Sequence, residues 1–226
     1  MPTIVVANPK GGSGKSTTAL VLGITLAGKG ARVTLIDADA NHPLTTWHNG
    51  RPRQVEVIGG LTDETFVSTL DREAACRDAV IVDLEGAATR IVSRAIMRAD
   101  LTLIPMQASM VDAAQAGRAV GLVRQEEELL RRSIPLRVVL TRTSAAIPTR
   151  VERKIIDEMA TRGIPALKTH LHERAAFKAL FEYKSTLAEL DPAKVNGLAA
   201  ALSNAETFTD EVIVLLKSIA VGRAAA

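Results

Sequence analysis

The stretch NPKGGSGKST near the N-terminus constrains this chain most, because it joins a strand pattern directly to a helix pattern. The β-branched, apolar run Thr3–Ala7 predicts a buried parallel strand, and residues 15–29 carry apolar side chains at helical spacing. Glycines at positions 11, 12 and 14 permit backbone angles that point successive N–H groups at one anion. The helix N-terminus would face the same anion. The stretch therefore predicts a phosphate-binding loop.

This loop departs from the common pattern G-x-x-x-x-G-K-[ST], which would place glycine where this chain has Pro9. Lys15 would nevertheless neutralise the outer phosphates of a nucleotide, and the hydroxyl of Ser16 suits a Mg²⁺ ion. A glycine-rich turn without a ligand is the alternative, and the complete order of strand, loop and helix argues against it. One phosphate site needs one lysine, so the second lysine of the loop, Lys10, requires its own explanation.

Composition predicts one α/β domain spanning residues 1–226, long enough for a large core. Hydrophobic residues make up 47% of the chain and aromatic residues only 3%, which is typical of a parallel sheet packed with aliphatic side chains. The single cysteine, Cys76, excludes a disulfide framework. We identify neither a signal peptide nor an apolar run long enough to cross a bilayer, so we expect a cytoplasmic protein.

Strand and helix patterns alternate along the rest of the chain. Strand-like runs are Val33–Asp37, Val55–Ile58, Ala79–Asp83, Leu101–Pro105, Leu136–Thr141 and Ala166–Thr169. Helix-like runs are Glu64–Ala75, Thr89–Ala99, Val111–Arg132 with Asp112 as its expected cap, Thr149–Arg162, Glu173–Tyr183 and Ala193–Ile219. This alternation predicts a doubly wound α/β fold, a mainly parallel sheet with helices on both faces.

Acidic residues end two of the expected strands. Asp37 and Asp39 lie in TLIDADANHP, and Asp83 lies in IVDLEG. Ligands of open α/β sheets bind at the carboxyl ends of the strands, beside the phosphate loop. Helix capping or turn formation would explain any one acid alone, but three beside a phosphate loop indicate a site for Mg²⁺ and a nucleotide.

Four motifs together resemble the ParA/MinD family of deviant Walker-A ATPases: KGGSGKST, LIDADANHP, AVIVDLEG and ADLTLIPMQASMVD. The resemblance runs from residue 3 to about residue 190, and it is strongest to short ParA-type partition ATPases without an N-terminal DNA-binding domain. It implies a P-loop NTPase fold, hydrolysis of ATP with Mg²⁺, and a homodimer that encloses two ATP molecules.

The resemblance also implies roles for individual residues. Lys10 would reach the nucleotide of the partner subunit, whereas Lys15 would bind the β- and γ-phosphates of its own site. Asp39 would orient the attacking water. The remaining assignments are Gly11, Gly12, Ser13 and Gly14 for the phosphates, Thr17 for the α-phosphate, Ser16, Asp37 and Asp83 for Mg²⁺, and Thr141, Arg142 and the 170–174 loop for the base.

Two stretches depart from the family pattern. Leu84, Glu85 and Gly86 follow the third-strand acid in place of the usual proline or small polar residues. Ala40, Asn41 and His42 follow the second acid where the family often has D-P-Q. Neither change removes a phosphate or metal group, but both bear on hydrolysis, which we expect to be slow and stimulated by a partner.

Positive charge is concentrated in one part of the chain. The net charge is +3, yet the segment from Arg131 to Lys184 holds twelve Lys/Arg and five Asp/Glu. Such a surplus is typical either of a nucleic-acid surface or of solvated helix faces. The candidates for DNA contacts are Arg150, Arg153, Lys154, Arg174, Lys178 and Lys184. His170 and His172 are too few to indicate a metal site, and Trp47 is expected to pack.

Several functions fit this pattern. The first is an ATP-gated dimer that binds non-specific DNA on the nucleoid and positions a plasmid, chromosome region or other cargo with a ParB-like or adaptor partner. A MinD-like membrane ATPase is less favoured, because the last helix has only Lys217 and Arg223 as cations beside three acids. An iron–sulfur ATPase would need more cysteines. A ParA-like adaptor in DNA transfer with weak hydrolysis remains an alternative.

Overall fold

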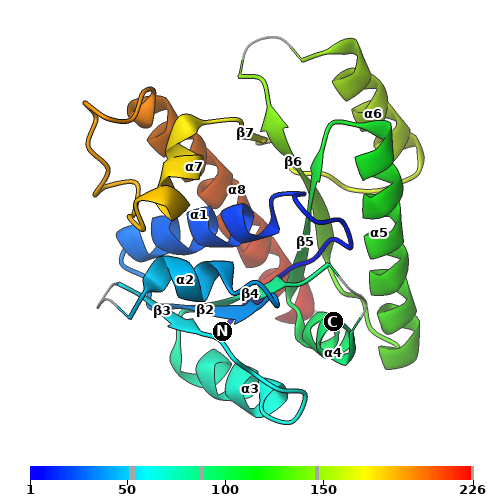
Figure 1. Ribbon diagram of the computed structural model, residues 1–226. Coiled ribbons are helices and arrows are strands. Elements are labelled where there is room, and N and C mark those ends of the chain that lie inside the picture. Colours follow the sequence, from blue (N-terminus) through cyan, green and yellow to red (C-terminus); the bar gives the residue numbers. More distant parts are fainter. Residues whose placement is uncertain (51–53, 87–88, 146–147, 225–226) are drawn as a thin grey trace.

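The computed structural model describes residues 1–50, 54–86, 89–145 and 148–224, which include a seven-stranded parallel sheet (Figure 1). The strands are β1 Thr3–Val6, β2 Val33–Ala38, β3 Val55–Ile58, β4 Ala79–Leu84, β5 Leu101–Gln107, β6 Leu136–Thr143 and β7 Leu171–His172. Their spatial order is β3-β2-β4-β1-β5-β6-β7. The central strands are buried on both faces, as their continuous apolar runs predict.

Helices cover both faces of the sheet, and each face has its own apolar core. One layer contains α1 Lys15–Gly28, α2 Pro43–His48, α7 Ala175–Glu182 and α8 Leu198–Ala224. The other contains α3 Phe66–Cys76, α4 Arg90–Arg98, α5 Met110–Leu130 and α6 Arg150–Thr161. The predicted doubly wound α/β fold is therefore confirmed.

The sheet order places β1, the strand that leads into the phosphate loop, between two neighbouring strands. β1 pairs with β4 on one side and with β5 on the other, so Val6 lies beside both Asp83 and Leu103. The next strand on the β4 side is β2, whose Asp37 pairs with Asp83. The carboxyl ends of these strands meet where the connections diverge to opposite faces, which is where open α/β sheets bind ligands.

The expected strand Ala166–Thr169 is wrong. Only Ala166 forms a bridge, to Val138, and the seventh strand lies at Leu171–His172. Between Ala166 and β7, side chains of α8 form hydrogen bonds with the backbone. Glu211 accepts from the N–H groups of residues 168 and 169 at 2.8 and 2.7 Å. Asn204 likewise bonds to the backbone of residues 170 and 172.

Two local predictions also need correction, and one short helix was missed. Ser109, not Asp112, caps α5, and its side chain accepts from the N–H of Asp112 at 3.1 Å. The last helix begins at Leu198 rather than Ala193, because Gly197 adopts a left-handed backbone with φ of 72°. The short helix α2 was not expected. Within it Trp47 is 1% exposed and donates to the carbonyl of Ser185 at 3.0 Å, which confirms its packing role.

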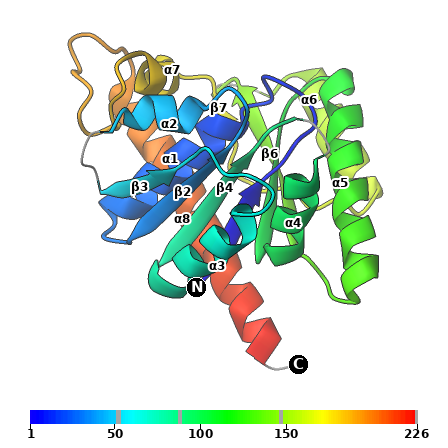
Figure 2. The same ribbon diagram turned by 60° about the horizontal axis from the view of Figure 1, so that its bottom comes forward.

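The helix α8 runs across one layer, and its last turns project past the sheet edge where the strands begin, on the side of the molecule where the N-terminus lies (Figure 2). Arg223 in its last turn bonds to Asp100, which also accepts from the N–H of Thr3 at 2.8 Å. Within the described ranges no helix combines the length and apolarity needed to span a membrane.

Candidate nucleotide site

A cavity of about 330 Å³ lies over the phosphate loop. The loop and the start of α1 form its floor, the ends of β2 and β4 form one wall, and Arg142 from β6 closes another side. Gly12 and Gly14 have φ of 73° and 99°, a left-handed backbone that glycine adopts without strain. Lys15, the first residue of α1, is 6% exposed, with its ammonium 3.3 Å from the carbonyl of Lys10. The cavity has the charge and shape of an anion site.

Side chains from neighbouring strands hold the loop in this shape. Asn8 donates to the carbonyl of Pro105 at 2.7 Å and accepts from the N–H of Lys10 at 2.8 Å. Gln107 donates to the carbonyl of Gly12 at 3.0 Å, and Thr141 donates to that of Ser13 at 2.8 Å. Sequence reasoning missed Asn8 and Gln107, because their partners depend on the order of the strands.

The three strand-end acids have different surroundings. Asp37 is 1% exposed and accepts from the N–H of Thr45 at 2.7 Å, which ties it to the start of α2. Asp39 is half-buried at the cavity wall, and its Oδ1 accepts both the N–H and the side-chain amide of Asn41 at 2.8 and 2.9 Å. Asp83 is fully buried, and within the described residues neither of its carboxylate oxygens has a hydrogen-bond partner.

Burial raises the pKa of Asp83 to about 7, and the Asp37 carboxylate adds to the rise. The Ser16 hydroxyl and the Lys15 ammonium oppose it. A buried carboxylate without partners beside a hydroxyl fits a divalent cation. Because the described residues contain no ready group of three or more His, Cys, Asp or Glu ligands, Mg²⁺ would take its other ligands from phosphates and water. Ser16 would hold it directly and Asp83 through water, and the ion would neutralise phosphate charge.

The cavity described above lies over the phosphate loop to which Lys10 belongs, and the side chain of Lys10 points away from this cavity. Its ammonium lies 2.7 Å from Oδ2 of Asp112 on α5, and the Ser109 hydroxyl donates to the same oxygen. The side chain of Lys10 is 33% exposed, whereas that of Asp112 is 3% exposed. Burial alone would raise the pKa of Asp112, but the hydrogen bonds from Lys10 and Ser109 outweigh it, so that pKa is lowered.

A second cavity, of about 290 Å³, adjoins the first. Gly14, Thr17 and Arg142 line both cavities, so one extended ligand would contact the two together. Of the candidates for base recognition, Thr141, Arg142 and the 171–174 segment line the second cavity, whereas His170 does not. The ring of His170 instead pairs with Glu152 on α6 at 3.1 Å, and His172 bonds to Thr143 at 2.9 Å.

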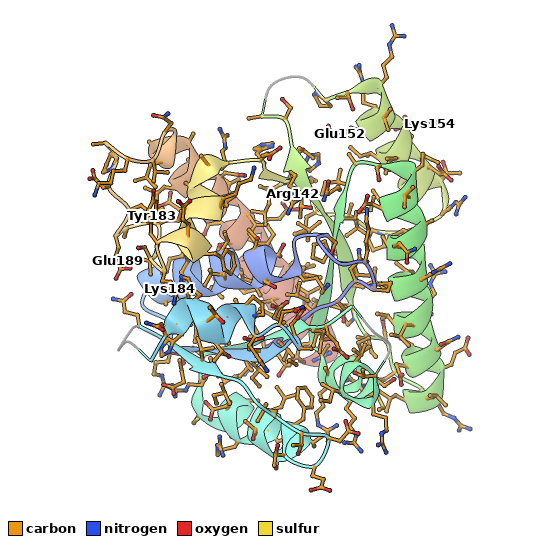
Figure 3. The ribbon with its side chains drawn as sticks, viewed as in Figure 1. Arg142, Glu152, Lys154, Tyr183, Lys184 and Glu189 are labelled. Atoms are coloured by element: carbon orange, nitrogen blue, oxygen red, sulfur yellow. The ribbon has the colours of Figure 1, made fainter. Side chains whose placement is uncertain are left out.

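The six candidate DNA contacts do not form one surface. Arg150, Arg153 and Lys154 are exposed on α6, and they form no ion pair within the described ranges. Figure 3 shows Lys184 on the opposite side of the molecule from Lys154. Lys178 pairs with Glu173 at 2.6 Å, and Arg174 lines the second cavity. The structure therefore gathers only the three α6 cations on one exposed helix.

Comparison with known proteins identifies the family. Residues 4–187 match the family described as the CobQ/CobB/MinD/ParA nucleotide binding domain. The chain belongs to this family. The ParA/MinD-type chain is 41% identical over 210 residues to "Protein ParA" of Rhizobium radiobacter, covering 92% of this chain and 94% of the relative. Its identity to the "Maintenance of carboxysome distribution protein A" of Gloeobacter kilaueensis is 32% over 187 residues, covering 78% and 82%.

A solved structure of a Cyanothece McdA variant in complex with ATP matches this ParA/MinD-type chain with a TM-score of 0.73. Identity is 22%, and the match covers 94% of this chain and 96% of that one, which shows a shared fold. The match to the family model and the 41% identical relative confirm the resemblance read from the sequence motifs, so this chain is a nucleotide-binding ATPase of the ParA/MinD type.

Proposed function

We propose that this protein is an ATP-driven dimeric switch that binds duplex DNA regardless of sequence and positions a plasmid, chromosome region or other cargo. The observation that carries the proposal is the arrangement of the two lysines of one phosphate loop. Lys15 lies in the cavity over its own loop, whereas Lys10 is directed onto α5, away from that cavity. A second copy of the chain would give Lys10 a phosphate to bind.

In this proposal, each subunit holds the phosphates of one ATP on the loop amides of residues 11–17 and on Lys15. Asp39, on the cavity wall, orients the water that attacks the γ-phosphate, and Asp37 supports the metal shell. Phosphoryl transfer needs positioning and charge neutralisation rather than a covalent intermediate. Thr141, Arg142 and the second cavity would bind the ribose and the base.

DNA binding would depend on dimerisation. Arg150, Arg153 and Lys154 provide too few cations for firm binding by one subunit, since each phosphate contact adds a counterion-release term to the affinity. Two copies would double these contacts along one duplex. The relatives support a positioning role, since one is named ParA and another is named for carboxysome distribution. We propose that the protein acts on the nucleoid in the cytoplasm with a ParB-like or cargo-adaptor protein.

A MinD-like membrane switch is the runner-up. A membrane-binding helix of that kind needs a free amphipathic segment with a basic face. Here Asp210, in the middle of α8, pairs with Lys29 at 2.9 Å, and Arg223, in its last turn, pairs with Asp100. The C-terminal half of α8 therefore contacts the body of the protein at both of its ends. A DNA-transfer adaptor with weak hydrolysis would bind ATP in the same site and would differ in turnover.

Fluorescence polarisation on two duplexes of unrelated sequence tests the proposal. We expect binding with ATP and Mg²⁺, little binding with ADP, no sequence preference and strong weakening by salt. Replacing Arg150, Arg153 and Lys154 with alanine should abolish it, whereas the matched change Arg118→Ala on α5 should not. Equal binding with ADP and ATP would contradict the switch. ATP-dependent binding to anionic liposomes without DNA binding would support the membrane alternative.

A further inference from the structure

The residue Glu85 lies in the stretch that departs from the family pattern, directly after β4. Successive side chains of a strand alternate between its two sides, so Glu85 follows the alternation that places Asp83 at the phosphate site. Glu85 lines the 330 Å³ cavity over the phosphate loop together with Lys15 and Asp39. The cavity therefore has an acidic side chain from each of two neighbouring strands.

The strand register explains why Glu85 and Asp39 face the same cavity. Asp37 pairs with Asp83, and Ala38 pairs with Leu84. Asp39 and Glu85 are the first residues after this last pair, one beyond the end of β2 and one beyond the end of β4. The first pair of acids is buried at the metal position, and the second pair lies outside it on the cavity wall.

Close packing fixes the backbone of this segment against the phosphate loop. A Cβ added to Gly86 would lie 2.6 Å from the carbonyl oxygen of Pro9, a distance at which the backbone must shift. Glycine therefore permits the chain to pass directly over the loop. This approach holds the preceding residue, Glu85, at the cavity wall.

The side chain of Glu85 is half-buried and makes no hydrogen bond or ion pair within the described part of the chain. Asp39 differs, because one of its oxygens already accepts two hydrogen bonds from Asn41. An unpaired carboxylate beside a site for a triphosphate is unfavourable unless it binds something between itself and the phosphates. Water is the group of suitable size and hydrogen-bonding capacity.

We propose that Glu85 is a second water-positioning residue, which accepts a hydrogen bond from the attacking water while Asp39 accepts another. The inference rests on the proposed ATPase function. The water oxygen forms a bond to the γ-phosphorus, and the bond from that phosphorus to the bridging oxygen breaks. ADP leaves with the electron pair of that bond, and both protons of the water stay with the phosphate product, which is released as H2PO4⁻. Glu85 holds the water in line without itself being consumed.

Steady-state hydrolysis and calorimetric ATP binding test this role. For Glu85→Ala we expect kcat to fall about tenfold or more, with an ATP Kd within about twofold of the unchanged protein. Glu85→Gln keeps one acceptor oxygen, so its kcat should fall less than that of Glu85→Ala. The matched control Glu64→Ala removes an exposed acid outside the cavity and should leave kcat unchanged. Because Glu85→Gln keeps the size of the side chain, it also provides a readout if the alanine variant folds poorly.

A structural role is separated from a positioning role by combining changes. If Glu85 and Asp39 hold the same water, the variant with both replaced by alanine should lose less than the product of the two single losses. Losses that multiply would overturn the inference, as would a Glu85→Ala kcat within twofold of the unchanged protein or above it. If the unchanged protein binds ATP but never hydrolyses it, the ATPase proposal fails and the inference fails with it.

Discussion

The ammonium of Lys10 lies 2.7 Å from a carboxylate oxygen of Asp112, although 102 residues separate them in sequence. Asp112 is almost fully buried, and its other oxygen has no partner within the described residues. If Lys10 leaves to bind the nucleotide of a second subunit, Asp112 loses the one cationic partner that it has among the described residues. Breaking such a pair is costly because a buried charge remains uncompensated. We therefore expect the contact to oppose the proposed dimerisation until ATP binding offsets its loss.

Replacing Asp112 with asparagine should promote ATP-dependent dimerisation. The amide keeps the side-chain volume but removes the charge that retains Lys10. We expect half-maximal dimerisation at about a tenfold lower protein concentration, which corresponds to roughly 1.4 kcal/mol. Static light scattering with ATP measures it. Ser109→Ala, which keeps the charge pair, is the control, and weaker dimerisation of Asp112→Asn would show that Asp112 supports the dimer instead.

The two lysines of the phosphate loop should have separable effects. Lys15→Ala removes the ammonium of the site itself, so we expect calorimetry to detect no ATP binding. Lys10→Ala should bind ATP with near-normal affinity yet form no ATP-dependent dimer, because its target lies in the other subunit. Each variant serves as the control for the other. An undiminished dimer for Lys10→Ala would exclude a role across the interface.

The buried Asp83 should make the nucleotide-free protein less stable as the pH rises. Its pKa is raised from 3.8 to about 7, so between these values the folded protein holds a proton that the unfolded chain releases. The free energy of unfolding therefore decreases as pH rises through this range, by roughly 4 kcal/mol at about 1.36 kcal/mol per pKa unit. Denaturant melts of the protein and of Asp83→Asn, in EDTA, measure the difference. The difference in free energy of unfolding between the two proteins should grow from pH 4 to pH 7 and then level off. A difference that stays constant with pH would contradict the raised pKa.

Gly86→Ala should weaken ATP binding by displacing the phosphate loop. The new Cβ would meet the carbonyl of Pro9 at 2.6 Å, and neither backbone segment can yield cheaply. We expect a loss of stability of about 1 to 3 kcal/mol together with a weaker ATP affinity. Gly117→Ala on α5 is the matched control, because nothing lies within 4 Å of its Cβ. That control should be stabilised by up to about 1 kcal/mol, because alanine favours helix.

Local sequence patterns predicted the α/β class, the phosphate loop and the approximate positions of most helices and strands. These features depend on local patterns, since side-chain periodicity and glycine content act within a few residues. The same local logic located Asp37, Asp39 and Asp83 at strand ends, because an apolar run that stops at an acid marks the end of a buried strand.

Contacts between groups that are distant in the sequence depend on the tertiary structure. Lys10 contacts Asp112 because the spatial order of the strands brings their segments together. For the same reason Asn8 and Gln107 hold the phosphate loop in shape, and His170 pairs with Glu152. The last strand shifted to Leu171–His172 for a related reason: side chains of α8 satisfied the backbone before it. Such hydrogen bonds form between elements far apart in sequence, so no periodicity within either element could predict them.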